Sequence, residues 1–155
     1  MKPIDKQPDY TLEDSLGYWV NRVSRTIRQY LNQELKRLNF KVTGEQFAVL
    51  VHLWNQEGRT QQELGQELTK EKTTMTRMLN GLEALGLIQR HSDPLDGRIR
   101  RIHLTTKGQK TMKKLTALAG EVLKTAQIEV VPSDLLTCKK VLQRVHQTVA
   151  LKLAV

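Results

Sequence analysis

Apolar residues recur at helical spacing in the first part of the chain, from about residue 11 to residue 38. Side chains that repeat every three or four positions form one stripe of an α-helix, and here arginines occupy the opposite side. Thr11 and Asp14 stand three residues apart, a weak variant of the capping box that marks helix starts. We therefore predict a helix over residues 11–38. It is about seven turns long, so its apolar stripe needs a partner surface from this chain or another subunit.

Two further helix starts carry stronger capping boxes, in which a threonine and the Gln or Glu three residues later cap each other's backbone N–H groups. The pairs are Thr43 with Gln46 and Thr60 with Glu63. An almost wholly apolar helix follows the first pair, and Gly58 ends it. A short helix over residues 61–68 follows the second pair, and after a turn comes a helix over residues 72–86. This order of elements predicts a helix-turn-helix.

The helix over residues 72–86 has an outer face rich in hydrogen-bonding groups. Its inner side carries Met75, Leu79, Leu82 and Gly86. Its outer side carries Thr73, Arg77 and Asn80, with Thr74 and Thr76 at the margins. Hydroxyl, guanidinium and amide groups bind base edges and phosphate oxygens, whereas an ordinary surface helix more often shows Glu/Lys pairs. We therefore predict a DNA recognition helix whose contacts come from these five outer and marginal residues.

After Gly86 the apolar period changes to two, which predicts strands over residues 87–91 and 98–104 joined by a turn. Asp96 and Gly97 are the turn signal, because glycine tolerates a positive φ. Residues 87–114 hold eight basic and two acidic residues, +6 of the chain's formal charge of +9. A hairpin of this kind beside a recognition helix is typical of a wing. We therefore predict that residues 43–105 together form a winged helix-turn-helix. A solvated basic hairpin is the alternative.

Two more helices are expected over residues 106–155. Thr106 with Gln109 forms the capping box of the first, which reaches about Ile128, and Pro132 breaks it. The last helix carries one apolar stripe, and Cys138 lies on it. Inert packing suits this thiol better than redox sensing, because no basic group is placed to lower its pKa. The sequence thus predicts a mainly α protein with a small β-wing, flanked by long N- and C-terminal helices.

The overall charge favours a polyanionic partner. A chain of 155 residues fits a single domain, and a pI near 9.9 favours nucleic acid or an acidic membrane. The single cysteine fits a reducing compartment. The N-terminus has no apolar signal region, and no apolar run approaches ~18 residues. We therefore expect a cytoplasmic protein without membrane contact.

The motifs of the helix-turn-helix and wing resemble those of the MarR-type transcriptional regulators. The resembling segments are residues 73–77, 82–88, 93–98 and 102–105 with Gly108. The resemblance spans essentially the whole chain and implies an obligate homodimer on a pseudo-palindromic operator in double-stranded DNA. It assigns Asp96 to orienting the wing by pairing with an arginine, and Arg98 to the minor groove. Gly97 departs from the family, since many relatives carry a charge there, and Arg100 or Arg101 would compensate.

The sequence offers no catalytic or metal-binding constellation. Its four histidines lie on different predicted elements, and no metalloprotease motif, phosphate loop or nucleophile elbow occurs. We expect neither an enzyme nor a bound cofactor. The expected function is a sequence-specific repressor. A winged-helix protein-interaction module and a non-specific nucleoid-type protein are the alternatives, and salt-dependent binding to random DNA and preference among DNA sequences would separate the three.

Many relatives release DNA when a small aromatic or phenolic anion binds between the dimerisation helices and the winged helix. The resemblance suggests four lining residues here: Trp19, Arg22, His52 and Trp54. They would supply stacking surface and a partner for a carboxylate. The alternative is that both tryptophans belong to the core.

Overall fold

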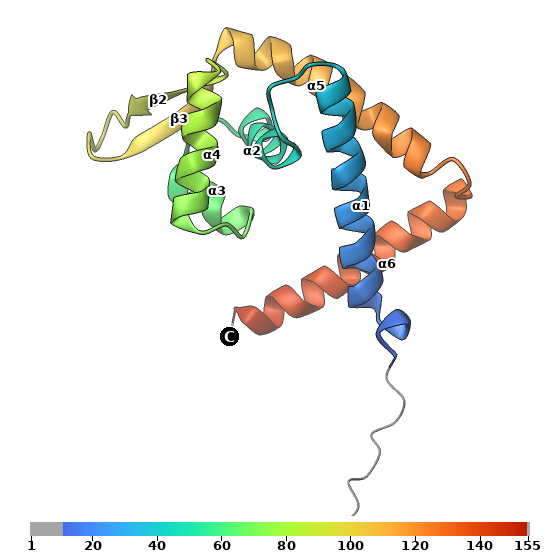
Figure 1. Cartoon of the computed structure of the whole chain (residues 1–155). Coiled ribbons are helices and arrows are strands. Elements are labelled where there is room, and N and C mark those ends of the chain that lie inside the picture. The colour runs from blue at the N-terminus through green and yellow to red at the C-terminus, as the bar shows by residue number, and fades with distance from the viewer. Residues whose placement is uncertain (1–10, 155) are drawn as a thin grey trace, which may run out of the picture. The chain divides into compact units, whose positions relative to one another are not determined.

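The computed structural model describes residues 11–154, which are mainly helical with one small antiparallel sheet (Figure 1). The predicted class, mainly α with a small β-wing, is therefore confirmed. The expected arm over residues 1–10 lies outside the described residues. The described residues form two compact units, which divide between Val122 and Leu123.

The first unit contains the helix-turn-helix and the wing. Its elements are α1 (Leu16–Arg37), α2 (Gly44–Asn55), β1 (Arg59–Thr60), α3 (Gln61–Glu67), α4 (Lys72–Ala84), β2 (Ile88–Ser92), β3 (Arg100–Leu104) and most of α5 (Thr106–Ala126). In Figure 1 the β2–β3 hairpin projects beside α4, and α3 lies against α4. The order matches the predicted winged helix-turn-helix.

The first helix begins later than predicted. Thr11 does bond to Asp14, but the two residues bracket a short 3₁₀ turn, η1 (Leu12–Asp14). Ser15 then caps α1, accepting a hydrogen bond from the backbone N–H of Tyr18. The prediction was wrong here because a Thr-to-Asp spacing of three closes a single turn as readily as it starts a long helix.

Both stronger capping boxes are confirmed. The Thr43 hydroxyl accepts from the Gln46 backbone N–H at 3.2 Å, and the Gln46 side chain accepts from the Thr43 N–H at 3.0 Å. Thr60 and Glu63 exchange the same two bonds at the start of α3. Gly58 has φ +75°, which suits the left-handed turn before β1.

Strand β1 was not predicted. It pairs with β3 in the order β1-β3-β2, with Arg59 opposite Ile102 and Thr60 opposite Arg101. The wing sheet is therefore joined to the start of α3 as well as to the end of α4.

The wing loop is longer than predicted, since β3 begins at Arg100 and not at residue 98. The reasoning about Gly97 was also wrong. Among the described glycines, positive φ occurs at Gly58 and Gly86, not at Gly97. Side-chain carboxylates shape this loop instead, because Asp93 and Asp96 both accept backbone N–H groups within it.

The core of the first unit lies where α4 packs on the neighbouring helices and the sheet. Its fully buried members include Leu35, Leu50, Leu53, Leu64, Met75, Leu79, Leu82, Ile102, Met112 and Leu115. The predicted inner side of α4 is thus confirmed for its three large apolar residues. Because this core fixes the rotation of α4 about its own axis, it also fixes which side chains α4 presents outward.

The start of α5 is capped differently from the prediction. The Thr105 hydroxyl, not that of Thr106, accepts the capping bond, from the Gly108 N–H at 2.9 Å. The same hydroxyl donates to the Gly86 carbonyl at 2.6 Å. Gly108 packs so closely on the Leu87 carbonyl oxygen that a Cβ there would overlap it.

The second unit comprises the end of α5 and α6 (Pro132–Leu153). Pro132 does not break α5, which already ends at Ala126. It lies in the first turn of α6, where its missing N–H has no helical partner to lose. No residue of α6 is buried, and Cys138 is exposed within this chain, although inert packing was predicted for it. None of the helices in residues 11–154 has the length and apolar content needed to cross a membrane.

Candidate nucleic-acid interface

The outer face of α4 carries the side chains that the sequence placed there. Thr73, Arg77 and Asn80 are exposed, and Thr74 and Thr76 are half-buried at its edges. Together with Lys72, four of these residues line a shallow hollow along the helix: Thr73, Thr76, Arg77 and Asn80. The hollow offers a hydroxyl, an amide and a guanidinium to a ligand that lies along α4.

Two of the five predicted contacts also hold the fold together. The Thr76 hydroxyl donates to the Lys72 carbonyl at 2.8 Å and accepts from the Gln61 side chain at 2.6 Å, which ties α3 to α4. The Asn80 side-chain oxygen accepts from Arg90 of β2 at 2.9 Å, and Arg90 also pairs with Glu83. Thr73 and Arg77 are therefore the outer residues of α4 best placed to reach a ligand.

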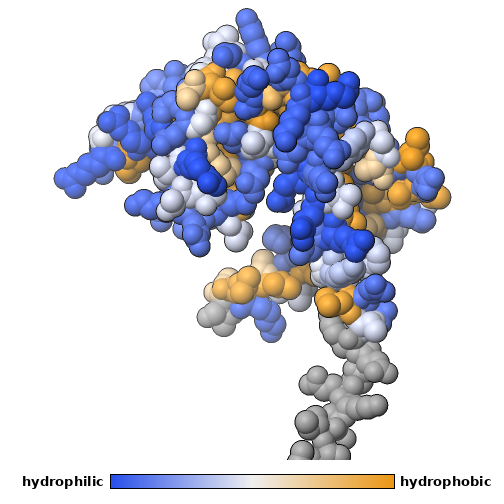
Figure 2. Space-filling view, in the orientation of Figure 1, coloured by the Kyte–Doolittle hydropathy of each residue, from blue (hydrophilic) through white to orange (hydrophobic). Residues whose placement is uncertain are grey.

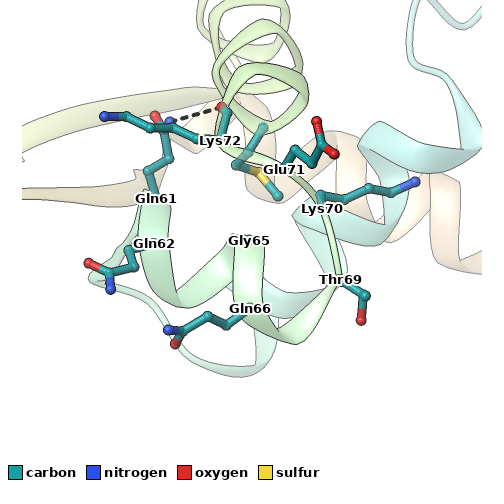
Figure 3. Close-up of a pocket in the computed structure, with 9 residues that line it drawn as sticks. Gln61, Gln62, Gly65, Gln66, Thr69, Lys70, Glu71 and Lys72 are labelled. Carbon is teal, nitrogen blue, oxygen red and sulfur yellow. Dashed lines mark hydrogen bonds between the residues drawn. The ribbon is translucent and has the colours of Figure 1, made fainter.

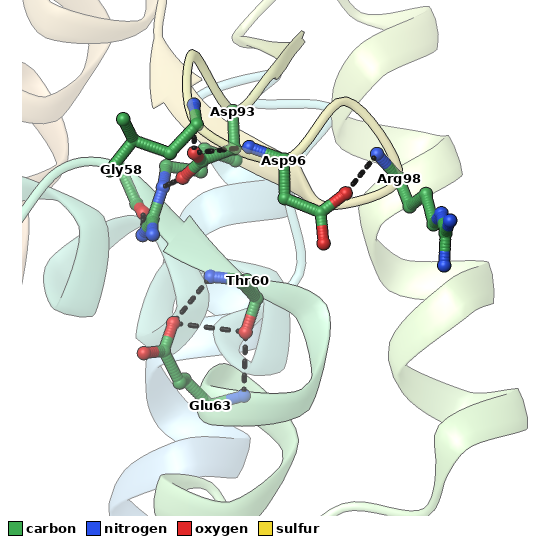
Figure 4. A network of polar contacts seen from close by, with 8 residues as sticks. Gly58, Thr60, Glu63, Asp93, Asp96 and Arg98 are labelled. Atoms are coloured by element: carbon green, nitrogen blue, oxygen red, sulfur yellow. Dashed lines mark hydrogen bonds and ion pairs between the residues drawn. The ribbon is translucent and has the colours of Figure 1, made fainter.

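Asp93 is the centre of the polar network at the wing (Figure 4). Asp93 is only 8% exposed, and its carboxylate accepts from the Leu95 N–H at 2.8 Å and the Asp96 N–H at 3.2 Å and pairs with Arg101. The Arg101 guanidinium, aided by the backbone N–H of Leu95, holds the pKa of Asp93 below its usual range. Asp93 thus stays ionised and keeps the loop folded around it.

Arg101 extends this network from the wing to the helix-turn-helix. A second guanidinium nitrogen donates to the Gly58 carbonyl at 2.8 Å, just before β1 (Figure 4). The prediction that Asp96 pairs with an arginine is wrong, because Asp93 has that role. The Asp96 carboxylate accepts the Arg98 backbone N–H at 3.0 Å instead. Arg101, predicted as a possible DNA contact, is committed to these internal bonds.

The remaining predicted arginines lie at the end of the hairpin. Arg100 donates to the Ser92 hydroxyl at 2.7 Å across the two strands. Arg98 lies in the loop, and Figure 4 shows its side chain extending away from the Asp93 network. The bond from its backbone to Asp96 fixes the direction of the chain at this point. Arg98 is therefore an exposed cation on a structured loop, which is what insertion into a narrow groove requires.

Sequence reasoning missed a hollow between α3 and the turn before α4 (Figure 3). It has a volume of about 730 Å³ and is lined by Gly65, Met75 and seven polar or charged residues: Gln61, Gln62, Gln66, Thr69, Lys70, Glu71 and Lys72. The signal was present in the run of glutamines that opens α3 directly after the Thr60 cap. These side chains border the recognition helix and enlarge the candidate surface.

The four predicted effector residues fall into two groups with separate contacts. Arg22 lies over the rings of Tyr18 and Trp19, and the Trp19 indole N–H donates to the Glu13 carbonyl at 2.7 Å. The other group contains His52, whose Nδ1 lies 2.7 Å from a Glu67 carboxylate oxygen. The alternative that both tryptophans are core residues is wrong, because Trp19 is 49% and Trp54 is 46% exposed.

Two histidines meet on the wing without completing a metal site. The rings of His91 and His103 lie edge to face with centroids 5.4 Å apart, and Glu57 is 3.4 Å from His103. Within residues 11–154 no three His, Cys, Asp or Glu side chains are grouped so that they could hold a metal ion.

A helix-turn-helix with an exposed polar recognition face, followed by a wing with an arginine in its loop, defines a winged-helix DNA-binding regulator of transcription. The chain belongs to the MarR family, whose sequence profile matches residues 42–99. It is 31% identical over 112 residues to the organic hydroperoxide resistance transcriptional regulator of Bacillus subtilis, covering 72% of this chain and 75% of that one. Members of this family are transcriptional regulators, not enzymes.

Other similar proteins and solved structures are also transcriptional regulators. Over 105 residues the chain is 30% identical to the transcriptional regulator HosA of Escherichia coli, covering 66% of this chain and 78% of that one. The fold superposes on crystalline apo MarR of Escherichia coli with a TM-score of 0.75, at 26% identity, covering 84% and 96% of the two chains. A probable transcriptional regulator from Pseudomonas aeruginosa gives a TM-score of 0.75 at 25% identity, covering 87% and 99%.

Proposed function

We propose that the protein is a homodimeric, sequence-specific repressor that binds a pseudo-palindromic operator and leaves it when a small molecule binds. The observation that carries the DNA-binding proposal is the pairing of two exposed features. Thr73 and Arg77 stand on the outer face of α4, and Arg98 stands in a wing loop that Asp93 and Arg101 hold in place. The first feature suits a major groove and the second a minor groove.

Exposed apolar stripes support the homodimer. Leu16, Val20 and Val23 of α1 are exposed within the single chain, as are Val145 and Val149 of α6. Each set repeats at helical spacing, so each forms a continuous apolar surface that water disfavours. An isologous dimer buries the same apolar surface on both subunits, and it presents two recognition helices related by a two-fold axis. Half-sites about 34–36 Å apart then make the operator pseudo-palindromic.

A cluster at the start of α1 supports control by a small aromatic or phenolic anion. Arg22 lies within 6.0 Å of the centres of two aromatic rings, and a hollow of about 330 Å³ adjoins it. Tyr18 and Arg25 also line this hollow. An aromatic ring would stack on Tyr18 while its carboxylate or phenolate pairs with a guanidinium.

Selection of bound sequences from a pool of random duplexes tests the DNA-binding proposal. Recovery of one inverted-repeat sequence, bound at least about a thousandfold more tightly than random DNA, is the expected result. Equal binding to all sequences would make the protein a nucleoid-type binder. Absence of any salt-dependent binding would leave the protein-interaction module.

Addition of a panel of salicylate-like compounds to the selected complex tests the effector. Loss of binding with a raised melting temperature of the free protein is expected, and no response across the panel would overturn ligand release. The single cysteine fits a site of action in the reducing cytoplasm.

A further inference from the structure

One side of α1 is basic and has no acidic residue of its own. Arg25, Arg28 and Lys36 are exposed along it and, with Gln29, Asn32 and Gln33, line a hollow of about 500 Å³. This side is opposite the apolar stripe of the same helix. The sole acidic residue of α1, Glu34, lies off this side and pairs with Arg37 at 2.6 Å. We call this surface, defined by Arg25, Arg28 and Lys36, the α1 basic face.

The α1 basic face adjoins the helix-turn-helix. The Asn32 side chain accepts the Gly44 N–H at 2.8 Å, which fixes α1 against the start of α2. In the next residue, Glu45 of α2, a carboxylate oxygen lies 3.9 Å from Arg28 and 2.7 Å from Lys70. In Figure 2 the side chains over α1 on the face turned to the viewer are largely hydrophilic.

A cation of the recognition helix also acts on the Glu45 carboxylate. Its pKa is held below the usual range by Lys70 first, with smaller effects of Arg28 and Arg77. Arg77 belongs to the outer face of α4. The pKa of this one carboxylate is therefore lowered by cations of α1, of the turn before α4 and of α4. Through Glu45 and Lys70, the α1 basic face adjoins the hollow between α3 and the start of α4, which is part of the candidate DNA interface.

The charges on this surface do not balance. Four cations lie on or next to this surface: Arg25, Arg28, Lys36 and Lys70. Among the described residues, Glu45 is the one carboxylate that pairs with any of them, and it pairs with Arg28 and Lys70. Arg25 and Arg28 stand one helical turn apart on α1, so their charges repel each other unless an anionic partner compensates them. Arg25 and Lys36 are eleven residues apart, about 16 Å along the helix, which is too long for one small anion. A DNA strand, in contrast, offers a phosphate about every 3.4 Å of its axis.

We infer that the α1 basic face is an accessory site for the phosphate backbone of duplex DNA. It binds phosphates next to those at the half-site that α4 reads, and the glutamine and asparagine side chains add hydrogen bonds without reading sequence. The inference rests on the proposed DNA-binding function and extends it, since it predicts affinity from a helix outside the winged helix-turn-helix. Glu45 limits that affinity by occupying Lys70 and part of Arg28.

Neutralising the face tests the inference. The triple variant Arg25→Gln, Arg28→Gln, Lys36→Gln removes three charges, and a matched control, Lys139→Gln, Lys140→Gln, Arg144→Gln, removes three from α6. Binding of each to random duplex DNA is measured over a range of salt concentrations. We expect the first variant to bind about tenfold more weakly and to lose about two to three from the magnitude of the slope of log K against log salt. The control should keep the wild-type slope. Equal slopes in the two variants would overturn the inference.

The variant Glu45→Gln provides a test of opposite sign if the triple variant folds poorly. It keeps every cation and frees Lys70, so binding to random DNA should tighten and the salt slope should steepen by about one. An unchanged slope would count against the site. The operator-to-random affinity ratio separates this inference from the proposed function. The ratio should survive in all variants, whereas a wild-type ratio near one would contradict sequence-specific repression and leave the slope comparison intact.

Discussion

The guanidinium of Arg101 pairs with the carboxylate of Asp93 and, through a second of its nitrogens, donates to the Gly58 carbonyl 2.8 Å away. One side chain thereby connects the wing loop, β3 and the residue before β1. Because β1 leads directly into α3, the wing and the helix-turn-helix are held at a fixed distance from each other. The loop that carries Arg98 is thus ordered before any DNA is bound, which lowers the entropy lost on binding.

Arg98 and Arg101 should fail in different ways when replaced by alanine. Arg98→Ala removes an exposed groove contact, so operator binding should weaken by about 1–3 kcal/mol while the melting temperature stays unchanged. Arg101→Ala removes the anchor of the wing loop, so it should lower both the affinity for the operator and the melting temperature. Titrations of operator DNA with thermal melts of the free protein distinguish the two. Loss of folding in Arg98→Ala would contradict the role given to it.

The Asp93–Arg101 pair should make folding stability depend on pH. The pKa of Asp93 is lower in the folded state than its ordinary value of about 3.9, so the unfolded chain binds the proton more readily. The contribution is therefore complete above that value and is lost as the pH falls through the lower pKa of the folded state. Denaturant unfolding of wild type and Asp93→Asn from pH 7 to pH 2.5 measures it. The difference between the two proteins should shrink at the acid end, and a constant difference would exclude the ion pair as its cause.

Arg77 should read bases on the operator. Its guanidinium is exposed on the outer face of α4, whereas Thr76 and Asn80 also serve internal contacts. We expect Arg77→Ala to cost about 1–3 kcal/mol on the selected operator and clearly less on random DNA. Equal losses on both would identify a phosphate contact instead.

Gly97 should accept a charged side chain and gain DNA affinity. No atom lies within 4 Å of a Cβ built on it, and its φ is not in the left-handed region. Gly97→Arg therefore adds a cation to the wing loop without strain, and the salt slope should steepen by about one with tighter binding. Gly97→Gln is the uncharged control and should leave the slope unchanged.

Two glycines of α5 should respond to alanine in opposite directions. At Gly108 a Cβ would overlap the Leu87 carbonyl oxygen, so Gly108→Ala should destabilise the protein by about 1–3 kcal/mol or more. Gly120 has open space around it, and alanine there should stabilise the helix by about 0.5–1 kcal/mol. Urea unfolding at one fixed protein concentration measures both. A loss at both positions would place Gly120 in a tight contact between subunits.

Local features were predictable from the sequence and distant pairings were not. The outer face of α4 follows from helical periodicity, and the boxes at Thr43 and Thr60 from a spacing of three residues. Strand β1 depends on pairing Arg59 with Ile102, more than forty residues later, which no local pattern encodes. The exchange of roles between Asp93 and Asp96 has the same origin. Both stand in one short motif, and only the position of Arg101 in the folded sheet selects between them.

The junction between α4 and α5 decides where a regulatory motion can occur. The last carbonyls around α4, those of Leu85 and Gly86, accept from Lys107 and Thr105, and the Leu87 carbonyl accepts from the Thr105 N–H. These bonds tie the end of the recognition helix to the first turn of α5, so the two helices are expected to move together. The recognition helix and the start of α5 are therefore one mechanical unit, and Thr105 and Lys107 are the side chains that join them.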